Sequence, residues 1–161
     1  MASEGYHEPI GELSDDTRDN EYCYRVDNVS ALTIDGFDIW SASTGGSVSV
    51  PAHIYLDDNG APDATAAAST TMTVDATAGF YTATFNPPIT VTGTFYLGFD
   101  TTAQNAYLSN LNSGASGVGF YRDLANGPNN WTQSGLVQNP SWIVNCQSGG
   151  TGLVPHMSSN G

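Results

Sequence analysis

The sequence Gly-Thr-Phe-Tyr-Leu-Gly-Phe at residues 93–99 carries the clearest structural signal in the chain. Large apolar side chains occupy every second position, at Phe95, Leu97 and Phe99. A period of two is that of a β-strand, in which successive side chains point to opposite faces. We therefore predict a strand here, with these three residues facing a core and with neighbouring strands on both sides.

Short strands of the same kind precede and follow this one, with no long amphipathic helix between them. They are rich in Val, Ile, Thr, Tyr and Phe and are separated by Gly, Pro, Asn and Asp. Within residues 31–40 the inward phase shifts after Gly36, which indicates a β-bulge. Asn59-Gly60 predicts a hairpin turn, because both residues tolerate positive φ. We predict an all-β, antiparallel β-sandwich of about nine to eleven short strands, with the spacing of a jelly roll.

The charge of the chain excludes several classes of partner. Its 161 residues include no lysine, and three arginines face sixteen carboxylates, which gives a net charge of −13. Nucleic acids and anionic membranes are bound largely through Lys and Arg, so we expect neither partner, and no apolar run is long enough for membrane insertion. Charged residues are only 12% of the chain, and neutral Gly, Ser, Thr and Asn are abundant. This composition is typical of a secreted, extracellular or cell-surface protein, although no signal peptide is recognisable here.

The domain organisation is simple. We expect a single β-sandwich domain at residues 22–150. Residues 1–21 contain seven of the sixteen acids and no periodic pattern, so we interpret them as a partly ordered acidic arm. Residues 151–161 include a Gly-Leu-Val-Pro sequence that resembles a protease-site remnant, and we interpret them as a vector-derived tail.

The two cysteines, Cys23 and Cys146, lie near the two ends of the predicted domain. Each is within an apolar, aromatic run that predicts a strand, and first and last strands are often neighbours in a sandwich. We therefore expect a Cys23–Cys146 disulfide, which would be worth about 4–5 kcal/mol in the chain-entropy model for so long a loop. The alternative is two buried free thiols, which behave as small hydrophobic groups.

Oxygen ligands cluster in one predicted turn. Asp57, Asp58, Asn59 and Asp63 could supply carboxylate and amide oxygens, which are the ligands that Ca²⁺ prefers. Their spacing differs from that of the EF-hand loop. An ordinary hairpin also accounts for Asp-Asp-Asn-Gly, so a structural calcium site and a metal-free turn both stay open.

Three short motifs occur between about residues 30 and 100: Phe-Asp-Ile-Trp at 37–40, Ile-Tyr-Leu-Asp-Asp-Asn-Gly-Ala-Pro-Asp at 54–63, and the strand at 93–99. Together they resemble accessory modules of large secreted bacterial proteins. The resemblance implies a jelly-roll domain of the carbohydrate-binding or cell-surface attachment type. This chain has Asp63 where many such modules have glycine and Leu97 where a tryptophan is expected, so the resemblance assigns no binding residue.

Carbohydrate binding requires aromatic rings that stack on sugars and polar groups that recognise hydroxyls. The irregular region at residues 120–142 offers both. The candidate ligand-binding residues are Trp131, Tyr121, Arg122, Asp123 and Asn130. We expect the two aromatic residues to stack and the other three to hydrogen-bond, whereas Trp142 belongs to a strand and is expected in the core. In the alternative, Trp131 folds down to cap the sandwich and Arg122 only neutralises Asp123.

Catalytic machinery is not recognisable in the sequence. The three histidines, His7, His53 and His156, lack metal-ligand spacing, and no nucleophile motif occurs. His53 is expected to be a hydrogen-bonded residue on the outward face of its strand. We therefore predict a non-catalytic binding module for a polysaccharide or cell-surface glycan. The alternative is a structural or self-assembling unit of a surface or filament protein, and a glycan-active hydrolase or lyase is the third hypothesis.

Overall fold

The computed structural model describes residues 2–6, 13–14, 20–28, 30–101, 106–109, 119–122, 130–133, 142–146 and 153–154. All regular structure in these ranges is β, which confirms the predicted class. Ten strands have four or more residues and four have two. The strands are β1 (Ala2–Tyr6), β2 (Leu13–Ser14), β3 (Glu21–Asn28), β4 (Leu32–Ser43), β5 (Val48–Asp58), β6 (Ala61–Pro62), β7 (Ala68–Val74), β8 (Gly79–Val91), β9 (Phe95–Asp100), β10 (Ala106–Ser109), β11 (Gly119–Arg122), β12 (Thr132–Gln133), β13 (Trp142–Cys146) and β14 (Leu153–Val154).

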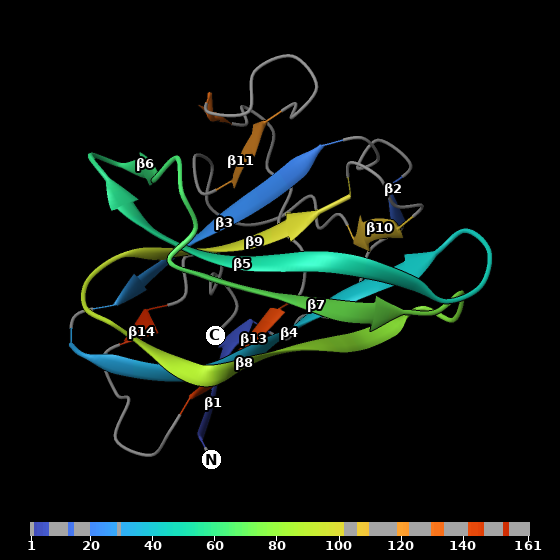
Figure 1. Ribbon diagram of the computed structural model, residues 1–161, viewed down its shortest axis with the longest axis horizontal. Helices are drawn as coiled ribbons and strands as arrows, with labels where there is room; N and C mark the ends of the chain where they lie inside the picture. The colour runs from blue at the N-terminus through green and yellow to red at the C-terminus, as the bar shows by residue number, and fades with distance from the viewer. Residues whose placement is uncertain are drawn as a thin grey trace.

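The strands form two antiparallel sheets (Figure 1). Sheet A has the order β1-β13-β4-β10-β2, with β8 paired to β4. Sheet B has the order β12-β11-β3-β9-β5-β6, with β7 paired to β5 and β14 paired to β3. The chain changes sheet between β3 and β4, between β4 and β5, between β7 and β8, and between β8 and β9, and β9 returns to lie between β3 and β5. This arrangement is an antiparallel β-sandwich, as predicted.

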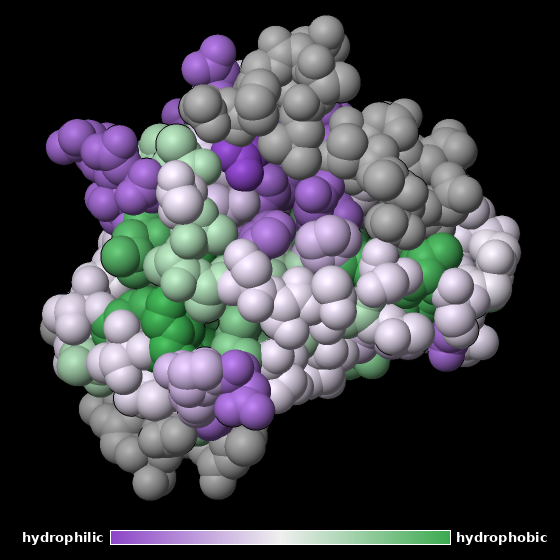
Figure 2. Space-filling model, in the orientation of Figure 1, coloured by the Kyte–Doolittle hydropathy of each residue, from purple (hydrophilic) through white to green (hydrophobic). Residues whose placement is uncertain are grey.

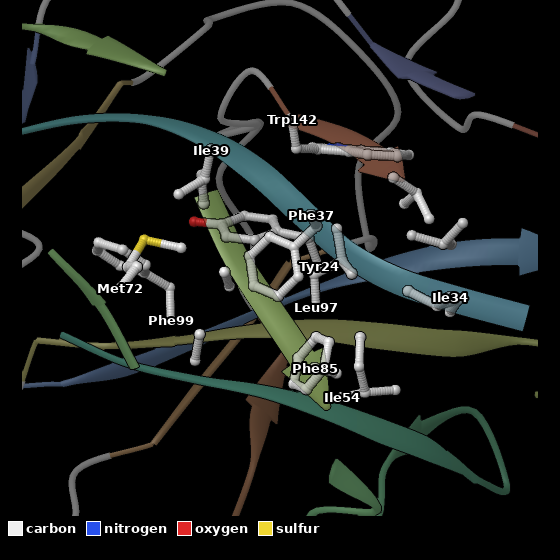
Figure 3. Close-up of a cluster of buried hydrophobic side chains, with 14 of the residues drawn as sticks. Tyr24, Ile34, Phe37, Ile39, Ile54, Met72, Phe85, Leu97, Phe99 and Trp142 are labelled. Carbon is white, nitrogen blue, oxygen red and sulfur yellow. The ribbon is translucent and has the colours of Figure 1, made fainter. Parts of the chain in front are cut away.

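The main core lies between the two sheets, and both contribute to it (Figure 3). Trp142 of β13 has no exposed surface, which confirms its expected core position. Each large apolar side chain buried in this way contributes about 1.5–3 kcal/mol. The labelled core residues are Tyr24, Ile34, Phe37, Ile39, Ile54, Met72, Phe85, Leu97, Phe99 and Trp142.

Strand β9 is the centre of sheet B, between β3 and β5, as its sequence predicts. Phe95, Leu97 and Phe99 face the main core. The opposite face of the strand is also buried, because Tyr96 is 0% exposed and belongs to a second cluster. Sheet B is therefore covered on both sides at this point, and its outer face carries the candidate functional site.

Two local predictions are confirmed. The pairing of β4 with both β8 and β13 skips Asp35, so a bulge lies next to Gly36. A Cβ atom at Gly36 would come within 2.0 Å of the Ala83 carbonyl oxygen, which explains why glycine is required. Asn59 and Gly60 have φ values of 54° and 92° and connect β5 to β6 as a two-residue hairpin turn.

Parts of both end segments pair with the sheets. Within residues 1–21, β1 pairs with β13, β2 pairs with β10, and Glu21 begins β3. Within residues 151–161, β14 pairs with β3. The short pairings arise at sheet edges and ends, where unpaired backbone groups are open to another strand.

The predicted disulfide is not formed. Cys23 and Cys146 are both free and buried. Cys146 faces the main core from sheet A, whereas Cys23 belongs to the cluster on the outer face of sheet B. The two thiols are therefore separated by a sheet, and the alternative of two buried thiols describes this structure.

The surface of the sandwich is largely neutral. Figure 2 shows pale, weakly polar residues over β5 and β7, with the most hydrophilic residues concentrated near the β5–β6 turn and the upper part of sheet B. Ser69, Thr71 and Thr73 are exposed on β7 and illustrate this use of hydroxyl groups. Among the described residues, no helix has the length and apolar character needed to cross a membrane.

Candidate functional site on the outer face of sheet B

A second cluster of buried side chains covers the outer face of sheet B. Strands alternate their side chains, so those that fill the main core present their other residues here. The segment after β6 folds back over β5, where the Asp63 and Ala67 amides donate to the Leu56 and Ile54 carbonyls, both at distances below 3.0 Å. The cluster consists of Cys23, Tyr55, Tyr96 and Phe120, with Ala61, Ala66 and Trp131 packed against it.

An ion pair between Glu21 and Arg122 lies at the edge of this cluster. The two residues are directly opposite on β3 and β11. Arg122 Nε and Nη2 lie 2.9 Å and 2.8 Å from Glu21 Oε2. Glu21 is 1% exposed and Arg122 is 8% exposed. A buried charge is tolerated only when it is paired and hydrogen-bonded, so each of these residues requires the other.

Neighbouring groups complete the hydrogen bonding of the pair. Arg122 Nη2 donates to the Tyr55 hydroxyl oxygen at 2.9 Å, and Arg122 Nη1 donates to the Ala64 carbonyl at 3.1 Å. The Tyr55 hydroxyl in turn donates to Glu21 Oε1. Burial, followed by the hydrogen bond to Glu21, raises the pKa of Tyr55 well above its ordinary value. Tyr55 therefore stays protonated and acts as a donor to the carboxylate.

Trp131 covers this polar group. The Arg122 guanidinium carbon lies 4.3 Å from the centroid of the Trp131 ring, which is cation–π geometry. The ring also meets Tyr55 in a T-shaped contact, with centroids 5.3 Å apart, and its Nε1 donates to the Asp63 carbonyl at 3.0 Å. Trp131 remains partly exposed. The structure thus fixes an aromatic ring at the surface through three different contacts.

His53 lies beside the ion pair on the outward face of β5. Its Nδ1 is 2.8 Å from Ser69 Oγ, which confirms the predicted hydrogen-bonded position. Its Nε2 is 3.9 Å from Glu21 Oε1. Burial lowers the pKa of His53 below 6.5, although the charges of Glu21 and Asp100 act in the opposite direction. His53 is therefore neutral at pH 7, and its contact with Glu21 is not an ion pair under that condition.

Gly98 of β9 provides the space for these side chains. A Cβ atom there would lie 2.8 Å from Tyr55 Cε2, 3.1 Å from His53 Cβ and 3.3 Å from Glu21 Oε1. The first of these distances is too short for any real Cβ contact. The glycine inside an otherwise bulky central strand is therefore explained by close packing of its cross-strand neighbours.

The predicted metal-binding residues lie in or beside the β5–β6 turn. Asp57 Oδ1 accepts from the Tyr96 hydroxyl at 2.6 Å, and burial raises the pKa of Tyr96. Asp58 Oδ1 accepts from Asn59 Nδ2 at 2.9 Å, and Asp63 Oδ1 accepts from the Thr65 amide at 3.4 Å. Within the described ranges, no group of three or more His, Cys, Asp or Glu side chains could hold a metal ion. The carboxylate oxygens of Asp57, Asp58 and Asp63 accept hydrogen bonds from neutral amide and hydroxyl groups. Calcium binding at this turn stays a prediction.

The predicted ligand-binding residues are only partly brought together. Trp131 and Arg122 are in contact, and Asn130 is exposed next to Trp131. Tyr121 follows Phe120 on β11 and therefore points to the opposite face of sheet B, where it is 38% exposed. Asp123 lies outside the described residues, so neither its expected role in ligand binding nor the alternative in which Arg122 neutralises it is tested, whereas the pairing of Arg122 with Glu21 is observed.

Sequence reasoning missed Glu21, Tyr55 and the position of His53 in this site. Glu21 was assigned to the acidic arm because six other acids precede it, yet it is the first residue of β3. A usable signal was present in the Gly-Phe-Tyr-Arg run at 119–122. An arginine at the end of an apolar strand requires a carboxylate when the strand is buried.

The carboxylate and the thiol of the site are enclosed by the protein. The Glu21 carboxylate is almost fully enclosed, and burial raises the pKa of the Cys23 thiol well above its ordinary value. Glu21 is therefore paired with Arg122, Tyr55 and Cys23 stay protonated, and the neutral His53 is hydrogen-bonded to Ser69. Trp131 and His53 are partly exposed, and Asn130 is exposed.

Comparisons with protein-family models, curated proteins and solved structures gave no match for this chain.

Proposed function

We propose that the chain is a non-catalytic, extracellular binding module, and that it holds a neutral carbohydrate against Trp131. The observation that carries this proposal is the fixed, partly exposed Trp131 ring, with Arg122 beneath it and its Nε1 bonded to Asp63. Aromatic rings bind the apolar face of a sugar, and polar side chains at the rim recognise its hydroxyls. The exposed amide of Asn130 would serve that second purpose.

Preorganisation favours Trp131 as the stacking residue. Binding costs free energy when a mobile side chain must be ordered, and this cost is smaller for a ring already held in place. Contacts with Tyr55, Arg122 and Asp63 hold this ring in the free protein. Little of the stacking energy would then be lost to ordering the residue.

The proposed ligand is uncharged. Nε, Nη1 and Nη2 of Arg122 all donate to groups of the protein itself, so its guanidinium is engaged in holding the site. A carboxylated or sulfated glycan would also be repelled by the net charge of −13. A neutral polysaccharide or cell-surface glycan satisfies both conditions.

A structural calcium ion at the β5–β6 turn is part of this proposal. Asp57, Asp58, Asn59 and Asp63 would be its ligands, replacing their present neutral donors. Because the Asp63 carbonyl also holds Trp131, such an ion would stiffen the binding surface. A melting temperature that rises in calcium and falls in EDTA would support it, and identical melting curves would remove calcium from the account.

The alternative is a structural or self-assembling unit without a small ligand. The hydrogen bonds and the ion pair among Glu21, Tyr55 and Arg122 favour this alternative. These groups already bind one another, so Trp131 would only shield them from solvent. It predicts no response to glycans and association that increases with protein concentration. Sedimentation velocity over a hundredfold concentration range separates it from the binding module.

Calorimetric titration with soluble neutral hexasaccharides of glucose, xylose and mannose tests the proposal. We expect one of them to bind, and we expect Trp131→Ala to weaken that binding by at least about tenfold through loss of stacking. Trp40→Ala is the matched control, since Trp40 is also partly exposed but belongs to sheet A. Equal affinity of wild type and Trp131→Ala, with both folded by circular dichroism, would contradict the assignment.

A further inference from the structure

The outer face of sheet A carries an aromatic pair next to a carboxylate. Trp40 of β4 lies directly opposite Phe80 of β8. Asp38 lies opposite Thr82 in the next row, which is two residues along the same strands and therefore on the same face of the sheet. The Trp40 and Phe80 rings are perpendicular, with centroids 5.1 Å apart. Phe80 is 38% exposed, and Trp40 and Asp38 are partly exposed. Strands β4 and β8 run side by side in the lower layer of Figure 1, whereas β3, β5 and β11, which carry the partners of Trp131, belong to sheet B.

Neutral donors hold the Asp38 carboxylate in place. Thr82 Oγ1 and Asn145 Nδ2 donate to Asp38 Oδ1 at 2.7 Å and 3.0 Å, and neither bond uses Oδ2. These bonds orient the carboxylate without neutralising its charge. The ion pairs among the described residues have Glu21 or Asp27 as the acidic partner, and none of them includes Asp38.

The chain itself has few cations with which to compensate this charge. It contains no lysine, and the two arginines that the structure describes, Arg25 and Arg122, both belong to sheet B. A second copy of the same chain would offer equally few. A basic partner would therefore supply cations of which this chain has few.

The spacing of the two rows suits a single cationic side chain. Residues two apart on a strand are separated by about 7 Å, and a cation interacts with an aromatic ring within about 6 Å of its centroid. An ammonium or guanidinium group between the rows can therefore contact the ring of Trp40 and Asp38 Oδ2 together. We propose that this face binds a basic segment of a protein partner, with a lysine or arginine side chain seated between Trp40 and Asp38.

The charge of the whole chain supports such a partner. A net charge of −13 steers basic segments toward the protein, and the aromatic pair next to Asp38 selects where the segment docks. This face belongs to sheet A and would bind a basic peptide segment, whereas the Trp131 site belongs to sheet B and would bind a glycan. The two proposals are therefore independent.

The test uses a fluorescent octapeptide of alternating lysine and glycine and a matched peptide with glutamine in place of lysine. Fluorescence anisotropy at 25 and 150 mM salt measures binding to the folded protein. We expect binding of the lysine peptide alone. Trp40→Leu should weaken it by about twofold to thirtyfold through loss of a cation–π contact. Asp38→Asn, which removes the paired charge, and Phe80→Ala, which removes the ring that packs against Trp40, should also weaken it measurably.

Two controls separate a specific site from the general acidic field. Asp27→Asn removes the same charge from β3 of sheet B, where Asp27 is partly exposed, and Tyr121→Ala removes an aromatic residue with the same 38% exposure as Phe80. Both should change the affinity by less than about twofold, since the distant charge is screened. Equal weakening by Asp27→Asn and Asp38→Asn overturns the proposal, as does absence of lysine-peptide binding. Glycan binding that is lost in Trp40→Leu, without any peptide effect, would assign the face to sugars and also overturn it.

Discussion

Arg122 and Glu21 are 101 residues apart in the sequence, yet Arg122 Nη2 lies 2.8 Å from Glu21 Oε2 beneath the Trp131 ring. The pair joins the neighbouring strands β3 and β11 of sheet B. It also links the stability of sheet B to the surface that we propose for ligand binding.

Removing the carboxylate of Glu21 should destabilise the fold strongly. Glu21→Gln leaves the buried Arg122 charge uncompensated, and breaking a buried pair typically costs about 3–5 kcal/mol. Urea denaturation measures the loss. The control is Asp27→Asn, because Asp27 pairs with Arg25 at 3.7 Å on the surface, where a pair is worth about 1 kcal/mol or less. Similar losses in both variants would show that the burial of the Glu21–Arg122 pair has no energetic consequence.

Gly98→Ala should destabilise sheet B by roughly 1–3 kcal/mol through overpacking. The added methyl group would lie 2.8 Å from the Tyr55 ring and 3.1 Å from His53 Cβ. Gly79→Ala is the matched control, since a Cβ atom at Gly79 meets nothing within 4 Å. Thermal or urea unfolding compares the two variants. A neutral Gly98→Ala would mean that Tyr55 and His53 can move aside freely.

Acid should weaken the protein in part through His53. Burial depresses the folded-state pKa of His53 below its ordinary value of 6.5. Between these two values the unfolded chain binds a proton that the folded chain does not, so the free energy of unfolding falls as the pH falls below 6.5. Above pH 6.5 this contribution is constant. In His53→Gln, urea unfolding at pH 7.5, 6.5, 5.5 and 5.0 should show a shallower decline, and parallel curves for variant and wild type would contradict the effect.

Both cysteines should react as thiols only after unfolding. Cys23 and Cys146 are free and buried, and burial raises the pKa of Cys23, so the native protein should resist alkylation. Under denaturing conditions without reductant, a thiol reagent should titrate two groups per chain, which is the full cysteine content. Finding none would restore the disulfide that the sequence suggested.

The sequence predicted the fold where the relevant physics is local. Alternation at 93–99 predicted the central strand β9, the phase shift at Gly36 predicted the bulge, and Asn59-Gly60 predicted the hairpin. Each of these depends on side-chain period or backbone φ, which neighbouring residues determine. The sheet to which a strand belongs, and the face that a residue occupies on it, depend instead on long-range pairing. The disulfide prediction was wrong for this reason, because Cys23 lies on the outer face of sheet B and Cys146 lies in the main core on sheet A.

The site was less predictable for the same reason. Composition and loop context indicated Trp131 and Arg122, and the structure brings them into contact. The partners that fix them, Glu21, Tyr55 and the Asp63 carbonyl, come from distant parts of the chain. Tyr121 was grouped with Arg122 by proximity in sequence, although adjacent strand residues point to opposite faces.

The indole N–H signals of the three tryptophans provide the most direct test of the central claim, that Trp131 is the ligand-binding residue. A ¹⁵N–¹H spectrum of the folded protein should contain one such signal for each of Trp40, Trp131 and Trp142, assigned with single Trp→Phe variants. On titration with the neutral hexasaccharides, the account predicts that the Trp131 signal shifts while that of Trp142, which is fully buried, does not. A Trp131 signal unchanged by every glycan would contradict the account and favour the structural unit.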